Sequence, residues 1–101
     1  MKYLEEYGLT DNEIETINEY IDRIDMDKDI FIYGKEKVMK ILDLFINIGV
    51  DNIFGIIITN PHIFGGSVDY VKEKIDEYDD KEELAKLINE DAGNLKLINL
   101  C

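Results

Sequence analysis

The sequence predicts an all-α protein built as a helical-repeat array. Apolar residues recur at intervals of three and four, which is the spacing of one face of a helix. The apolar pattern also returns after about 33 residues, and a period in the low thirties is typical of stacked helical units. We therefore expect about three units, with about six to eight short helices in all and no sheet.

The repeat is seen when the chain is compared with itself. A shift of about 33 residues pairs identical apolar residues: Ile24 with Ile57, Ile30 with Ile63, Phe31 with Phe64 and Val38 with Val71. A further shift of about 31 residues pairs Ile53, Ile56 and Ile57 with Leu84, Leu87 and Ile88. At 101 residues the chain has the length of one domain. We divide it into units of about 1–33, 34–66 and 67–101.

The first unit contains a short helix and a longer one. A helix at 2–7 is followed by Gly8, the residue type favoured just after a helix end. The stretch TDNE, residues 10–13, is a capping box in which Thr10 and Glu13 satisfy free amides at the start of the next helix. That helix carries one apolar stripe, formed by Ile14, Ile17, Ile21 and Ile24.

The second unit is predicted to contain a helix at about 36–48, which Gly49 ends. Its inward face is formed by Val38, Ile41, Leu42 and Phe45. Asp51 is expected to cap a second helix that runs through about Thr59 and is apolar on nearly every side, so other elements should cover it. The same run could be a buried strand. No partner strand is visible in the sequence, and a lone strand would leave its backbone unpaired.

Pro61 is expected to stop this helix at Asn60, because the residue before a proline is driven out of the α region. Residues 62–66 are expected to form a short link. Ser67 then caps a helix that extends to about Tyr78. Its inward residues are Val68, Val71 and Ile75.

The C-terminal part is predicted to form one more helix over about 79–91, which Gly93 ends. Leu84, Leu87 and Ile88 share one side of it. Residues 94–101 are expected to add a last helical turn or two. They include the single cysteine, Cys101, which has no partner in the chain for a disulfide and is simplest to place in a reducing compartment.

The stretch DMDKDIFIYGKE, residues 25–36, has most of the spacing of an EF-hand calcium loop. Its acids are Asp25, Asp27, Asp29 and Glu36. Position six of such a loop needs a positive φ, and here it is Ile30, for which that conformation is a steric outlier. In the repeat the stretch takes the place of the link ITNPHIF, where aspartates cap helices and form local turns. Calcium binding is therefore the weaker alternative, and we predict no metal site and no cofactor.

Residues 44–75 resemble the mitochondrial transcription termination factor (mTERF) family. The motif is a leucine-rich helix ending at Gly49, an aliphatic helix, Asn60-Pro61, Ile63-Phe64, and a helix capped by Ser67. The resemblance covers most of the chain. The first unit is a weaker copy without the proline, and the third has Asp91-Ala92 in its place. The resemblance implies a right-curving array of three-helix units, each with two longer helices and one short one.

The resemblance also implies binding of double-stranded nucleic acid along a basic concave face. The candidates for such a face are Lys35, Lys37, Lys40, Lys72 and Lys74, which lie near the starts of equivalent helices. The chain has 11 basic and 23 acidic residues, and its net charge of −12 repels phosphate backbones. Nucleic-acid binding of the mTERF type is therefore the alternative function.

Two acidic clusters predict a docking surface for a protein. The first cluster is Asp76, Glu77, Asp79, Asp80, Glu82 and Glu83. The second cluster is Asp22, Asp25, Asp27 and Asp29. We expect both to occupy equivalent loop regions of adjacent units and to form one negative edge; solvated loops are the alternative. Such an edge can bind a basic protein surface, including that of a nucleic-acid-binding protein, by charge mimicry. The main prediction is a small non-catalytic adaptor or inhibitor, with the first cluster as its partner-binding residues.

No set of residues predicts an enzyme. One histidine, His62, and one cysteine cannot form a zinc set or a Cys–His pair. The stretch GGS at 65–67 is not followed by the lysine of a P-loop, so we expect a turn and a helix cap. Paired carboxylates carry no catalytic signal in so acidic a chain.

The remaining features concern contacts and setting. Tyrosine is enriched at interfaces, and Tyr3, Tyr7, Tyr33 and Tyr70 lie off the clear core stripes. The third unit stops at LINLC, so a second copy could cover its last apolar face in a homodimer. The apolar runs are too short to span a bilayer, and no signal peptide is visible. We expect a cytoplasmic protein. The composition is poor in Ala, Arg and Pro and rich in Ile, Asn, Lys and Asp, a bias that AT-rich coding DNA produces and that suggests a low-GC bacterium or one of its mobile elements.

Overall fold

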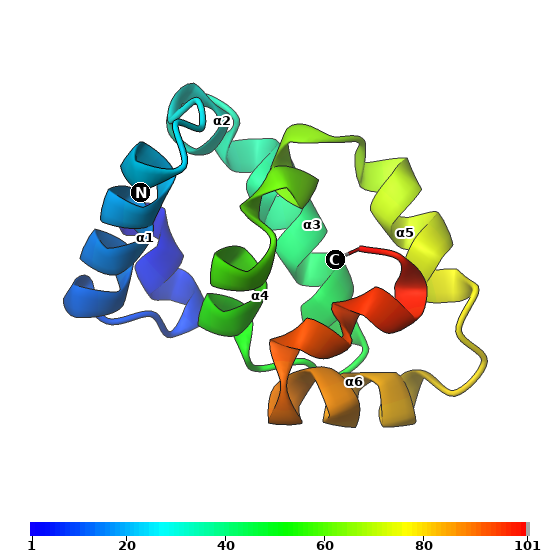
Figure 1. The fold of residues 1–101 in the computed structure, drawn as a ribbon. Coiled ribbons are helices and arrows are strands. Elements are labelled where there is room, and N and C mark those ends of the chain that lie inside the picture. Colours follow the sequence, from blue (N-terminus) through cyan, green and yellow to red (C-terminus); the bar gives the residue numbers. More distant parts are fainter. Residues whose placement is uncertain (101) are drawn as a thin grey trace.

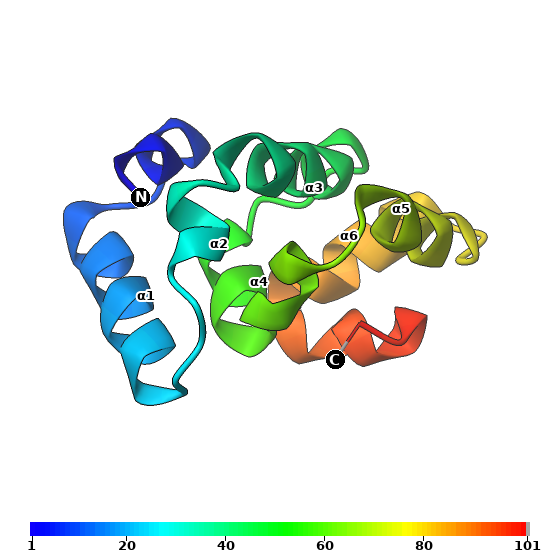
Figure 2. The same ribbon diagram turned by 90° about the horizontal axis from the view of Figure 1, so that it is seen from above.

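The computed structural model describes residues 1–100, and these residues form helices and turns with no strand. The predicted all-α class is therefore confirmed. Cys101, on which the disulfide argument rests, lies outside the described residues. The helices pack into a body of 35 × 24 × 22 Å (Figures 1 and 2).

Each third of the chain contains three helical segments, the last of which is short. In chain order they are η1 (Lys2–Tyr7), α1 (Asp11–Arg23), α2 (Asp29–Ile32), α3 (Lys35–Asn47), α4 (Ile53–Thr59), η2 (Pro61–Gly65), α5 (Val68–Asp76), α6 (Lys81–Glu90) and η3 (Ala92–Ile98), where η marks a 3₁₀ helix. The predicted link after Pro61 is therefore η2, a short helix with the proline at its start, where the missing N–H costs nothing.

Local capping signals form as the sequence predicts. Thr10 Oγ1 accepts a hydrogen bond from the Glu13 amide at 3.1 Å, and the Thr10 amide donates to the Glu13 carboxylate at 2.9 Å. Gly8 ends η1 with φ 86°, and Gly49 follows α3 with φ 107°. These left-handed conformations favour glycine because a side chain is strained there. Ser67 caps α5 by accepting from the Tyr70 amide at 3.0 Å.

Several predicted helix ends differ from the observed ones by one or two residues; for example, α5 ends at Asp76 rather than at about Tyr78, and α6 begins at Lys81. The cap of α4 is Asn52 rather than Asp51, and the Asn52 side chain accepts from the Gly55 amide at 3.2 Å. The α6 helix ends before Asp91, not at Gly93, because the Asp91 backbone is extended and its carboxylate accepts from the Gly93 amide at 2.8 Å. This bond starts η3, so the aspartate ends one helix and begins the next.

The core joins the three thirds of the chain. The α4 helix lies near the middle of the molecule, against α1 on one side and η3 on the other (Figures 1 and 2). Three of its side chains, Ile53, Ile56 and Ile57, are buried, as the all-round apolar pattern predicts. The rings of Phe31 and Phe64 pack against each other with their centroids 5.6 Å apart. These two residues are a pair related by the sequence repeat.

A side-chain hydrogen-bond network that the sequence did not predict joins α6 to the loop before α4. The amide oxygen of Asn89 accepts from the backbone N–H of Asp51 at 2.9 Å and of Asn52 at 3.2 Å. Its Nδ2 donates to the Gly49 carbonyl at 3.1 Å. Asn52 Nδ2 donates in turn to the Ile88 carbonyl at 3.2 Å. One asparagine thus satisfies three backbone groups of a loop that has no regular partner.

Two tyrosines fasten η1 to the rest of the molecule. Tyr3 donates to the Phe31 carbonyl at 2.7 Å, and Tyr7 donates to the Asp43 carboxylate at 3.1 Å. Burial, with the nearby Tyr7 as a second cause, raises the pKa of Tyr3 from 10.0 to about 12. Burial, followed by the hydrogen bond to Asp43, raises the pKa of Tyr7 to about 12. The sequence pointed to both as interface residues, but their hydroxyls bond within the chain.

We predict that Asn89→Ala lowers the free energy of unfolding by about 1 to 2 kcal/mol, because three backbone groups lose their partner. Asn47→Ala is the matched control, since Asn47 is exposed and makes no side-chain hydrogen bond among the described residues. Its effect should stay within about 0.5 kcal/mol. Urea unfolding followed by circular dichroism measures both, and equal effects would contradict the role given to Asn89.

We predict that alkaline pH destabilises the fold through Tyr3 and Tyr7. Their raised pKa values mean that the folded chain keeps protons that the unfolded chain releases, so stability falls as pH rises above about 10. Ultraviolet titration should resolve a late tyrosinate phase. Tyr7→Phe should reduce this phase, because it removes a hydroxyl whose pKa is raised; an unchanged late phase in this variant would contradict the assignment.

Candidate binding surfaces

The predicted partner-binding residues lie together where α5 turns into α6. We call Asp76, Glu77, Asp79, Asp80, Glu82 and Glu83 the acidic segment. Asp76 ends α5, the next three acids lie in the turn, and the last two lie in the first turn of α6. Figure 1 shows this turn at one end of the molecule, far from α1. All six residues are exposed.

Neighbouring lysines compensate part of this charge. Asp76 pairs with Lys72 at 2.8 Å, and the hydrogen bond from Lys72 holds the pKa of Asp76 below its usual range. Glu77 lies 3.8 Å from Lys74. Both pairs lie at the surface, although Lys74 is itself half-buried, and both connect residues one helical turn apart, so each contributes little to stability.

Other charges in the acidic segment serve the helix ends. Asp80 caps α6, and its carboxylate accepts from the Glu83 amide at 3.1 Å. Lys81 donates to the carbonyls of Asp76 and Tyr78, so its charge closes the end of α5. The carboxylates of Asp79, Glu82 and Glu83 make no hydrogen bond or ion pair with any described residue. The uncompensated negative charge is therefore concentrated on these three residues.

The second acidic cluster does not extend this surface. Asp22, Asp25, Asp27 and Asp29 surround the link between α1 and α2. Figures 1 and 2 show that link and the α5–α6 turn at opposite ends of the molecule. The expected single negative edge is therefore wrong. The two loops are also not equivalent by their order in the chain. The α1–α2 link joins the second and third segments of the first third, whereas the α5–α6 turn joins the first and second segments of the last third.

Within this cluster the aspartates form local contacts. Asp27 Oδ1 accepts from the Asp29 amide at 2.9 Å, which is the predicted local turn, and Asp22 pairs with Lys28 at 2.8 Å. Ile30 lies inside α2, so residues 29–32 are helical and do not follow the path of an EF-hand loop. Among residues 1–100, no three His, Cys, Asp or Glu side chains are grouped so that they could hold a metal ion.

Three of the predicted basic residues line one hollow. Lys35, Lys37 and Lys40, on the first two turns of α3, border a surface space of about 600 Å³ with Tyr33 and Val68. We call this space the lysine hollow. Lys35 lies 5.6 Å from the centre of the Tyr3 ring, and Lys37 donates to the Gly65 carbonyl at 3.3 Å. Lys40 makes no hydrogen bond, ion pair or cation–π contact with the described residues.

The other two predicted basic residues lie on α5 and are engaged elsewhere. Lys72 pairs with Asp76, as described above. Lys74 lies 5.3 Å from the centre of the Tyr70 ring and also faces Glu77. Helices α3 and α5 pack against each other, so the two groups of lysines belong to neighbouring helices. The carboxylates of Asp76 and Glu77, however, partly neutralise the positive charge of the two lysines on α5.

The C-terminal end is less exposed than the sequence predicts. Leu97 is 46% exposed, but Ile98 and Leu100 are buried by the chain itself. Asn60 Nδ2 donates to the Leu100 carbonyl and ties this end to the segment before η2. His62 is exposed on η2, the short helix that occupies the predicted link.

Comparison with protein families, with curated proteins and with solved structures finds no match to this chain. Within residues 1–100, none of the helices combines the length and the apolar character needed to cross a bilayer.

We predict that Asp80→Ala costs about 1 kcal/mol of unfolding free energy, because the first amides of α6 lose their cap. Asp79→Ala removes the same charge from the neighbouring residue, which makes no such bond, and should change stability by less than about 0.5 kcal/mol. Thermal unfolding of the two variants at one pH makes the comparison. If both were equally destabilised, general charge rather than capping would be responsible.

Proposed function

We propose that the chain is a right-curving mTERF-like array of three helical units, at about 1–33, 34–66 and 67–101. The order of the segments supports this reading, because each third holds three helical segments and the last is short. Phe31, Phe64 and Leu95 are related by the sequence repeat, all lie in the third segment of their unit, and all are fully buried. Contacts also follow the repeat, since α1 packs on α4 and α3 packs on α5.

We propose that this array is a small acidic, non-catalytic binding protein that acts as an adaptor or inhibitor of a protein partner. The acidic segment is the observation that carries this proposal. It places six acids around the α5–α6 turn at an end of the molecule, and three of them, Asp79, Glu82 and Glu83, lack a compensating contact among the described residues. A partner with a basic surface fits this charge, and a nucleic-acid-binding protein is one such partner.

The net charge favours a protein over a nucleic acid as the partner. At −12 the chain repels a phosphate backbone from most directions. Of the five lysines on α3 and α5 that could offset this repulsion, four already contact a ring, a carboxylate or a carbonyl. An encounter with a basic protein is instead accelerated by the same charge.

The alternative is nucleic-acid binding of the mTERF type, and the lysine hollow is the observation that favours it. Lys35, Lys37 and Lys40 line it together with the exposed ring of Tyr33. Lysines beside an exposed aromatic ring are a common arrangement for holding phosphates and bases. This function would depend on Lys40, whereas the protein-binding function would depend on Asp79 and Glu82.

We predict that the double variant Asp79→Lys/Glu82→Lys loses a basic protein partner while keeping its helical content. Neither side chain supports a described hydrogen bond, so the fold should lose only about 0.5 kcal/mol at each position. The unmutated chain and the variant are used as bait in lysate of the native host, and captured proteins are identified by mass spectrometry.

The control is Glu6→Lys/Glu19→Lys, which makes the same change of charge on two exposed residues of η1 and α1. A partner that binds the control but not the double variant supports the proposal. Equal capture by all three proteins contradicts it. Retention of duplex DNA at low salt that falls steeply with added salt, and that Lys40→Ala weakens, would support the alternative instead.

A further inference from the structure

A second surface hollow lies between η1 and α1, at the end of the molecule opposite the acidic segment (Figure 1). It has a volume of about 470 Å³, and Ile32 of α2 lies at its edge. We call it the η1–α1 hollow. All three segments of the first third contribute to its walls. It shares no residue with the acidic segment or the lysine hollow.

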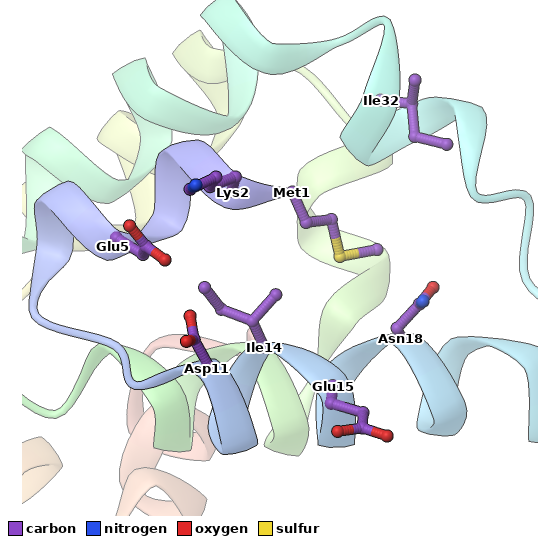
Figure 3. A pocket seen from close by; sticks show the side chains of 8 residues that line it. All are labelled: Met1, Lys2, Glu5, Asp11, Ile14, Glu15, Asn18 and Ile32. Carbon is purple, nitrogen blue, oxygen red and sulfur yellow. The ribbon is translucent and has the colours of Figure 1, made fainter.

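Three apolar side chains, Met1, Ile14 and Ile32, line this hollow together with polar and charged ones. Figure 3 shows Ile14 of α1 and Met1 pointing into the space between the two helices. Ile14 is partly buried against the core, and Ile32 is 49% exposed at the side of the opening. A helical protein that leaves such side chains around a concave space gains by covering them.

The rim of the hollow is acidic. Its walls include Glu5, Asp11 and Glu15, against a single basic residue, Lys2. Figure 3 shows Glu5 and Asp11 facing each other across the gap between η1 and α1. A hydrogen bond with Asp11, burial and the charge of Asp11 raise the pKa of Glu5 above its usual value. Two carboxyl groups this close leave negative charge that a cation from outside would relieve.

We propose that the η1–α1 hollow docks an amphipathic segment of a protein partner, with an apolar side chain in the hollow and lysine or arginine on the rim. Charge complementarity selects this occupant. A second copy of the chain would bring a net charge of −12 to an acidic rim. A lysine or arginine beside an apolar side chain matches both parts of the site, because its stem covers apolar surface while its charged head reaches the rim.

This surface goes beyond the proposed function, which rests on the acidic segment alone. The stacking of the molecule explains why the hollow is open. Helix α1 packs on α4, and α2 packs on α3 and η2, so these two helices are covered where they face the rest of the chain. The hollow lies on the side that no described element covers.

The test uses two synthetic peptides and the full chain labelled for NMR. The first peptide is an amphipathic helix of leucine and lysine, and the second has glutamate in place of each lysine. We expect the lysine peptide to shift the amide signals of Glu5, Ile14 and Glu15, and the glutamate peptide to shift none of them.

Matched variants separate the hollow from general charge. Ile32→Ser should weaken binding of the lysine peptide about fivefold, which is the loss of roughly half of a buried isoleucine contact. Ile46→Ser is its control, because Ile46 is 40% exposed on α3 and lies outside the hollow. Glu15→Lys should also weaken binding, and Glu19→Lys on the same helix should weaken it less. Circular dichroism verifies that each variant is folded.

Three results would overturn the inference. Signals that shift mainly in the acidic segment would show attraction to the most acidic turn. Equal losses for Glu15→Lys and Glu19→Lys would show attraction to charge in general. A dimer of the unmutated chain in sedimentation, dissociated by Ile32→Ser, would assign the hollow to a second copy. The variant Asp79→Lys/Glu82→Lys, which tests the proposed function, should bind the lysine peptide like the unmutated chain, so each idea can fail alone.

Discussion

The fold depends on burial of apolar side chains between successive thirds of the chain. The longest helices, α1 and α3, have 13 residues each, and helices of this length are marginal alone in water. Each becomes stable by covering its apolar face against a helix from another third. The contact of Phe31 with Phe64 shows this in one pair, since equivalent positions of two successive thirds meet in the core. No third of the chain has enough apolar partners of its own.

The same dependence explains where the charges lie. With the apolar residues committed to the contacts between segments, no polar or charged residue is fully buried in the described chain. Several aspartates instead occupy turns and helix starts, where Asp27, Asp80 and Asp91 accept backbone amide hydrogen bonds. Part of the acidity therefore has a structural role at the ends of helices. The acids that lack such a role, Asp79 and Glu82 among them, are the ones on which the proposed partner binding would depend.

The sequence predicted those features that depend on residues close together in the chain. The capping box at Thr10 and the cap at Ser67 are of this kind, because donor and acceptor lie three residues apart. The helix start at Asn52 was placed one residue early, because Asn89, distant in sequence, takes the amides of Asp51 and Asn52. The acidic clusters were judged equivalent although the repeat aligns Asp22–Asp29 with residues 55–62. The η1–α1 hollow was missed for a related reason, since its walls come from three separate segments.

The central position of α4 has a consequence for how the molecule opens. A helix enclosed by α1 and η3 can expose its amides only after one of these neighbours has moved away. Exchange of amide hydrogens with solvent should therefore be slowest in α4 and fastest toward the two ends. The acidic segment and the η1–α1 hollow both lie toward these ends (Figures 1 and 2), so a partner bound at either is expected to suppress the fluctuations from which local unfolding begins.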